Sequence, residues 1–301
     1  MLKINQSLQL ANNIRKHALM MTSLGGSSHI GSIFSICDIL AVLYGSILKF
    51  KSNDPRWIDR DRFILSKGHA GAGVYAALAE SGFFPIEKLK THYQDGSDLS
   101  GHVSHKGIPG VEFSTGSLGH GLPVIAGMAL AGKIDKKKHT NFVLMSDGEC
   151  DEGSNWEAIL FAAHHKLNNL VVIVDRNMLQ SIHSTEDTLA LEPFADKWKA
   201  FGWNVAQVDG HNHEEILKVL SNRVISEKPL CIIAKTVKGY GMGKSGESIN
   251  TTHQQKKLDE EDLLYYRDRF NVPLTDKQVK NIEFYKPDEN SEEIKYLKDK
   301  R

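Results

Sequence analysis

The stretch that decides the fold is residues 141–180, NFVLMSDGECDEGSNWEAILFAAHHKLNNLVVIVDRNMLQ. It contains two short, largely apolar runs, 141–145 and 170–174, separated by a segment with helical character. Short apolar runs on either side of a helix are typical of two buried parallel strands joined by a right-handed crossover. We therefore predict a βαβ unit here, whose helix opens with a capping box at residues 154–157.

The rest of the chain continues this alternation. Further apolar runs at 63–65, 205–208 and 230–234 lie between segments with helical character. Strands that alternate with helices predict an α/β fold, with a mostly parallel sheet and helices on both faces. We expect residues 1–245 to form this domain. Residues 246–301 are polar and rich in Lys and Glu, and we expect them to form a peripheral tail.

Composition excludes several classes of protein. Lys plus Arg and Asp plus Glu both number 37, so the balanced charge favours neither a nucleic-acid partner nor a membrane surface. Cys37, Cys150 and Cys231 lie far apart in the sequence, which fits a reducing compartment better than a disulfide framework. No stretch of 18 apolar residues is present, so we expect no membrane span and a cytoplasmic protein.

Polar residues follow both strands of the 141–180 unit. Asp147 comes directly after the first strand and Asn177 directly after the second. Parallel neighbours about 4.8 Å apart would bring both side-chain oxygens to one hard cation such as Mg²⁺, and Gly148 would let a phosphate approach the backbone. An Asp-Gly turn and an Asn cap are common without any ligand, so from these residues alone both interpretations stay open.

Asp147-Gly148, followed after a helix and a strand by Asn177, resembles the thiamine-diphosphate signature, with Ser146 in place of its usual first glycine. The order of further motifs resembles the N-terminal half of transketolases. The matching segments are, in chain order, 28–31, 66–69, 101–102, 116–121, 152–153 and 235–239.

The resemblance implies thiamine diphosphate and a divalent metal, Mg²⁺ or else Ca²⁺ or Mn²⁺, as cofactors. It places the metal on Asp147, Asn177 and the backbone carbonyl of Leu179. The other implied cofactor contacts are the diphosphate at Gly148 and His69, the aminopyrimidine at the backbone of Gly116 and Leu118, and a carboxylate network toward another subunit at Glu152.

Four of the 14 histidines carry an expected catalytic role by the same resemblance: His29, His69, His102 and His253. A neutral imidazole can bind a sugar hydroxyl and move a proton near pH 7. His253 is also an expected cofactor contact, although its surroundings keep little of the motif. The remaining loop and helix histidines that we considered lack motif support: His105, His164, His165, His183, His211 and His213.

The resemblance also implies a partner. In transketolases the glutamate that activates the cofactor, and most basic residues for sugar phosphates, belong to a domain that follows this one. No second βαβ series is apparent before Arg301. We therefore expect a separate C-terminal subunit with pyrimidine-binding and C-terminal domains, an α2β2 assembly, and transfer of a two-carbon ketol unit between sugars or sugar phosphates.

Parts of the sequence are compatible with four other functions. Residues 71–76 mimic a dinucleotide fingerprint but lack its later acidic residue, and residues 239–245 resemble a P-loop with the wrong spacing. An α subunit of a 2-oxo acid dehydrogenase or decarboxylase would share only the metal signature. A non-catalytic scaffold would need neither Asp147 nor Asn177.

Overall fold

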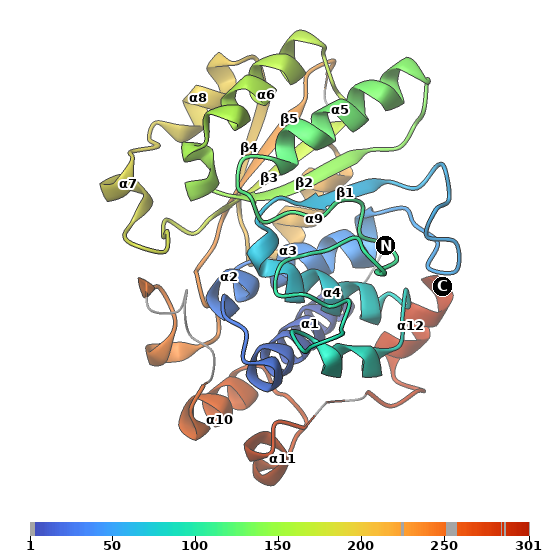
Figure 1. Ribbon diagram of the computed structural model, residues 1–301, viewed down its shortest axis with the longest axis vertical. Coiled ribbons are helices and arrows are strands. Elements are labelled where there is room, and N and C mark those ends of the chain that lie inside the picture. The colour runs from blue at the N-terminus through green and yellow to red at the C-terminus, as the bar shows by residue number, and fades with distance from the viewer. Residues whose placement is uncertain (1–3, 224–225, 251–257, 284, 286, 301) are drawn as a thin grey trace.

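A single parallel sheet organises the molecule. The computed structural model describes residues 4–223, 226–250, 258–283, 285 and 287–300. Its five strands pair in the order β1-β2-β3-β5-β4, and every pair is parallel (Figure 1). The bounds are β1 Arg62–Leu65, β2 Asn141–Ser146, β3 Leu170–Arg176, β4 Asn204–Asp209 and β5 Leu230–Lys235.

Helices cover both faces of this sheet, as predicted. The longer ones are α1 Ile4–Gly25, α4 Gly71–Glu80, α5 Gly121–Ile134, α6 Gly153–His164, α9 His213–Ser221, α10 Glu260–Arg269 and α12 Glu292–Lys300. The shorter ones are α2 Ile30–Phe34, α3 Cys37–Val42, α7 Thr185–Thr188, α8 Phe194–Ala200 and α11 Asp276–Lys280. Short segments of other helix types occur at Leu43–Ile47, Gly68–Ala70, Ile86–Thr91, Gly148–Asp151 and Gly243–Ser245.

The period of two in the strands produces two hydrophobic layers. In β3, Leu170, Val172 and Val174 pack with α5, α6 and α8, whereas Val171 and Ile173 pack with α1, α3 and α4. Figure 1 shows α5, α6 and α8 on one side of the sheet and α1, α3 and α4 on the other. β3 is therefore a strand with both faces buried, which explains its continuous apolar run.

The capping box predicted at residues 154–157 is wrong. Helix α6 begins at Gly153, and Glu152 occupies the N-cap position without a side-chain cap. The hydroxyl of Ser154 donates instead to the carbonyl of Gly119, at 2.7 Å. The Ser154 hydroxyl therefore bonds to the loop that precedes α5 and does not form the cap of helix α6 that the local sequence pattern predicted.

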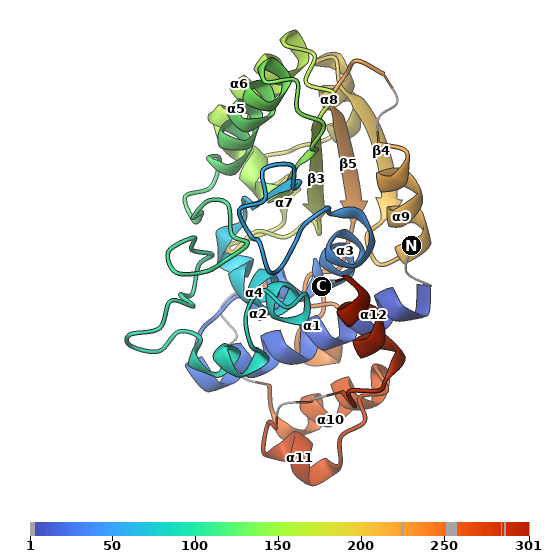
Figure 2. The ribbon, with the colours of Figure 1, turned by 90° about the vertical axis from the view of Figure 1, so that its right-hand side faces the viewer.

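The segment after residue 245 contributes to the core. Leu263 and Tyr266 of α10 and Val279 of α11 join the same hydrophobic cluster as α1. In Figure 2, α10 and α11 lie beside α1, on its side away from the sheet. The division of the chain at residue 245 stays a prediction.

None of the described helices has both the length and the apolar composition needed to cross a bilayer.

The double burial of β3 predicts an unequal response to the same substitution at two isoleucines. Ile173→Ala removes a side chain that is 1% exposed and should lower the free energy of unfolding by about 2–5 kcal/mol. Ile58→Ala, at a position that is 59% exposed, should change it by less than about 0.5 kcal/mol. Urea denaturation of both variants measures the difference, and equal losses would contradict the packing described here.

Candidate cofactor site

A cavity of about 250 Å³ opens at the carboxyl end of the sheet. β2 and β3 pair so that Ser146 lies opposite Asp175, and the residues that follow each strand therefore meet at one edge. The cavity is lined by His29, Ser32, Lys67, His69, His102, Gly116, Leu118, Ser146, Asp147, Gly148, Glu149, Asn177, Leu179, Gln180, Ser181 and Lys238. Nine of the expected site residues lie in this lining.

Asp147 is a buried carboxylate of the cavity, with 1% of its surface exposed. Its Oδ1 accepts from the backbone N–H of Gly148 at 2.8 Å, and its Oδ2 accepts from that of Met178 at 2.7 Å. Arg176 Nη1 lies 3.3 Å from Oδ2. Burial, and next the charge of Asp175, raise the pKa of Asp147 to about 6, so its charge is incompletely compensated by the chain.

Asn177 and Leu179 line the same cavity, and the carbonyl oxygen of Leu179 lies 3.4 Å from Lys238 Nζ. Met178 between them has a φ of 66°, and this left-handed turn lets both neighbours face the lining. Asn177 Oδ1 accepts from the N–H of Leu179 at 3.1 Å, and Asn177 Nδ2 donates to Asp175 at 2.9 Å.

This donor set fits a hard divalent cation. One carboxylate, one carboxamide oxygen and one carbonyl suit Mg²⁺, which is commonly held by one or two carboxylates together with phosphate oxygens. Among the described residues no group of three His, Cys, Asp or Glu side chains converges as a metal site. A cation at Asp147 would need further oxygen ligands, and Asn177 and Leu179 are lining residues with oxygens of the required kind.

Two buried lysines that we did not single out from the sequence face this cavity. Lys67 Nζ pairs with Asp175 at 2.5 Å and donates to the carbonyl of Ser32 at 3.0 Å. Lys238 Nζ donates to the carbonyl of Gln180 at 3.0 Å, and burial lowers the pKa of Lys238 to about 8. Lys238 adds positive charge to a cavity suited to a diphosphate, whereas the charge of Lys67 is matched by Asp175. Lys67 follows the end of β1 within motif 66–69, and Lys238 follows the end of β5 within motif 235–239. These positions are the features of the sequence from which a role at the cavity could have been predicted.

The loop that carries Gly116 and Leu118 is held against the Asp147 turn by Glu149. Glu149 is fully buried and accepts from the backbone N–H of Gly119 at 2.9 Å and from the hydroxyl of Ser66. Burial raises the pKa of Glu149, and the hydroxyl of Ser66 opposes that rise. This carboxyl group therefore fixes the distance between the two sides of the cavity, and sequence reasoning missed it.

Three of the four expected histidines form one cluster. The ring centroids of His29 and His69 lie 5.2 Å apart, those of His29 and His102 5.7 Å apart, and those of His69 and His102 6.5 Å apart. His29 sits just before α2 with a φ of 76°. These imidazoles can bind and orient a polyhydroxylated substrate at the cavity.

The structure separates the remaining candidates from this cluster. Glu152 is exposed at the start of α6 and does not line the cavity, so its expected role toward another subunit stays a prediction. His253 lies outside the described residues. The histidines without motif support, His105, His164, His165, His183, His211 and His213, are absent from the lining.

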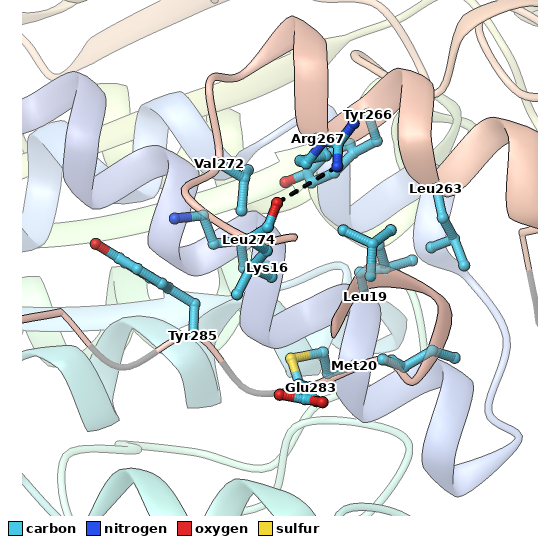
Figure 3. Close-up of a pocket in the computed structure, with 12 residues that line it drawn as sticks. Lys16, Leu19, Met20, Leu263, Tyr266, Arg267, Val272, Leu274, Glu283 and Tyr285 are labelled. Atoms are coloured by element: carbon cyan, nitrogen blue, oxygen red, sulfur yellow. Dashed lines mark hydrogen bonds between the residues drawn. The ribbon is translucent and has the colours of Figure 1, made fainter. Parts of the chain in front are cut away.

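A second cavity lies between α1 and the α10–α11 segment, and Figure 3 shows its largely apolar wall. It measures about 40 Å³ and shares no lining residue with the first cavity. A volume of that size accommodates one or two water molecules and is too small for a cofactor. Leu19, Met20 and Leu263 mark it as a packing gap.

Partial desolvation of the His102 ring predicts a titration. Partial burial lowers the pKa of His102, so its NMR titration midpoint should lie below the usual value of about 6.5 and its ring should be neutral at pH 7. Because the unfolded chain binds this proton more readily, the contribution of His102 to stability falls as the pH drops below about 6.5. A midpoint above that value would show that the ring is not desolvated.

Comparison with known proteins agrees with this geometry. The family described as transketolase, thiamine diphosphate binding domain, matches residues 6–286. The 6-deoxy-6-sulfo-D-fructose transketolase subunit SqwG of a Clostridium species is 41% identical over 83% of this chain and 91% of its own length. An apulose-4-phosphate transketolase subunit of Actinobacillus succinogenes is 41% identical over 83% of this chain and 90% of its own.

The crystal structure of transketolase from Campylobacter jejuni superposes with a TM-score of 0.85 at 29% identity, covering 99% of this chain and 49% of that one. The present chain thus spans about half of a full-length transketolase and nearly all of the two subunits. With the family match over most of its length, this chain belongs to the transketolase family of thiamine-diphosphate-dependent transferases, and it corresponds to their N-terminal, diphosphate-binding part.

Proposed function

We propose that this chain, in complex with a second subunit, transfers a two-carbon ketol unit from a ketose to an aldose, with thiamine diphosphate and Mg²⁺ as cofactors. One observation carries the proposal: Asp147, Asn177 and Leu179 line a single cavity together with three clustered histidines. A scaffold protein has no need for this combination. A 2-oxo acid dehydrogenase subunit would not require the histidine cluster.

Each side of the cavity has a distinct task in this proposal. Asp147, Asn177 and the carbonyl of Leu179 hold the cation, and Lys238 balances part of the remaining charge of the diphosphate. Thiamine diphosphate, when bound, supplies the carbon nucleophile for the reaction.

The histidine cluster serves the sugar. His29, His69 and His102 hydrogen-bond the hydroxyls of the donor and acceptor, and neutral rings can exchange protons with them. We infer that the substrates are sugars or sugar phosphates. The related subunits are named for a sulfonated and a phosphorylated ketose.

A surface suited to a partner subunit adjoins the cavity. Helix α5 begins directly after the loop of Gly116 and Leu118, and its one charged residue is Lys133. Gly127 and Ala131 are exposed on this helix, and Leu160 of neighbouring α6 is 60% exposed. A helix that is apolar on all sides is normally covered on all sides.

We infer that the pyrimidine-binding subunit covers α5 and α6 and completes the site, in an α2β2 assembly within which Glu152 reaches the other subunit. The relatives' names, as transketolase subunits, support a partner of this kind. The three buried cysteines are free thiols, which supports a cytoplasmic location.

Asp147→Ala in the purified complex should weaken thiamine diphosphate binding by at least about 10-fold, because loss of one hard ligand disrupts the shared cation. Ketol transfer should fall at least in proportion. Asp196→Ala is the matched control, since Asp196 is exposed on α8 and forms a surface ion pair with Lys199. Calorimetric titration with cofactor and Mg²⁺ measures both variants, and unchanged affinity in Asp147→Ala would refute the cofactor site.

Gly127→Glu should block association with the partner without harming the chain itself. A side chain at Gly127 meets nothing within 4 Å, and replacing a mid-helix glycine removes a cost of about 1 kcal/mol relative to alanine. The melting temperature of the lone chain should therefore hold or rise while co-purification is lost. Ser221→Glu, exposed at the end of α9 on the opposite face of the sheet, is the control. Intact co-purification of Gly127→Glu would place the partner elsewhere.

A further inference from the structure

Asp175 accepts hydrogen bonds from several buried side chains directly behind the proposed metal site. It is the penultimate residue of β3 and is fully buried, and it does not line the cavity. Its Oδ2 accepts from the hydroxyl of Ser35 at 2.7 Å, from Lys67 Nζ at 2.5 Å and from Asn177 Nδ2 at 2.9 Å. Its Oδ1 accepts from the hydroxyl of Thr236.

The contact with Asn177 determines which end of a carboxamide meets the cavity. A carboxamide has an NH₂ end that donates and an oxygen end that accepts, whereas an ionised carboxylate only accepts. The NH₂ end of Asn177 must therefore face Asp175, because the reverse orientation would set oxygen against oxygen. The oxygen end is then left to the side of Leu179, whose N–H it accepts at 3.1 Å.

The charge of Asp175 is matched on its other side. Lys67 is fully buried and pairs with the same Oδ2 that accepts from Asn177. A buried carboxylate without such a partner would be costly. Lys67 thus lets Asp175 serve as a fixed acceptor at the end of the central strand.

We propose that Asp175 is a positioning residue that holds the Asn177 carboxamide with its oxygen, and not its NH₂ group, toward the divalent cation. The proposal rests on the proposed function, since it requires a cation between Asp147 and Asn177. Partners that orient a metal ligand without touching the metal commonly affect metal affinity 10- to 100-fold.

The test measures Mn²⁺ affinity of the assembled complex by electron paramagnetic resonance in the presence of thiamine diphosphate, with the melting temperature recorded alongside. Asp175→Asn offers an amide in place of the fixed acceptor and should weaken Mn²⁺ binding by about 10- to 100-fold. Ser35→Ala removes another buried hydrogen bond to the same Oδ2 without touching Asn177. It should lower the melting temperature and leave the affinity for Mn²⁺ unchanged.

The double variant Asp175→Asn, Asn177→Asp reverses the polarity of the contact. Residue 175 then donates to residue 177, the total charge is kept, and a carboxylate presents an oxygen to the cation in either orientation. Mn²⁺ affinity should recover relative to Asp175→Asn alone. Should Asp175→Asn fail to assemble, this double variant carries the test by binding Mn²⁺ as the unmodified complex does.

Two results would overturn the proposal: an Asp175→Asn complex that binds Mn²⁺ as tightly as Ser35→Ala, or a folded double variant that fails to regain affinity. Failure of both Asp175 variants to assemble would leave Asp175 with a structural role alone, which also overturns it. If the unmodified complex binds neither Mn²⁺ nor thiamine diphosphate, the proposed function itself fails, and that result is distinct from the other outcomes.

Discussion

The pairing of β2 with β3 is the constraint on which the site depends. Six consecutive residue pairs, from Asn141 opposite Leu170 to Ser146 opposite Asp175, fix the strands in parallel register. Because both faces of β3 are buried, a shift of one residue would exchange its inward and outward side chains on both layers. The register therefore places the residue after β2 beside the residues after β3, and Asp147, Asn177 and Leu179 line one cavity.

This part of the candidate site could be predicted from the sequence because its residues lie close together along the chain. Both strands and their crossover lie within 40 residues, so strand ends could be paired without knowing the rest of the sheet. Lys67 and Lys238 follow β1 and β5, and the strand order that sets these beside β2 and β3 is not local information. The histidine cluster could be predicted only from the family resemblance, because His29, His69 and His102 belong to three separate segments of the chain. The capping box failed because Ser154 bonds a distant loop.

The cavity at the strand ends is structurally connected to the helical layer that contains α5. Glu149 ties the loop before α5 to the turn after β2, and the same loop leads into an apolar helix with an exposed face. On the opposite side of the sheet, α10 and α11 pack on α1 and continue its hydrophobic cluster. The C-terminal helices α10 and α11 thus pack on one layer, and α5 and α6 of the other layer, beside the cavity, carry exposed residues.

The central claim is that Asp147, Asn177 and the carbonyl of Leu179 hold one divalent cation with the diphosphate. An anomalous-difference map from crystals of the complex grown with Mn²⁺ and thiamine diphosphate tests it most directly. The account predicts a single peak bonded to those three oxygens and to diphosphate oxygens, at about 2.0–2.4 Å from each. A peak elsewhere, or a diphosphate held by Lys67 and Lys238 with no metal beside Asp147, would contradict it.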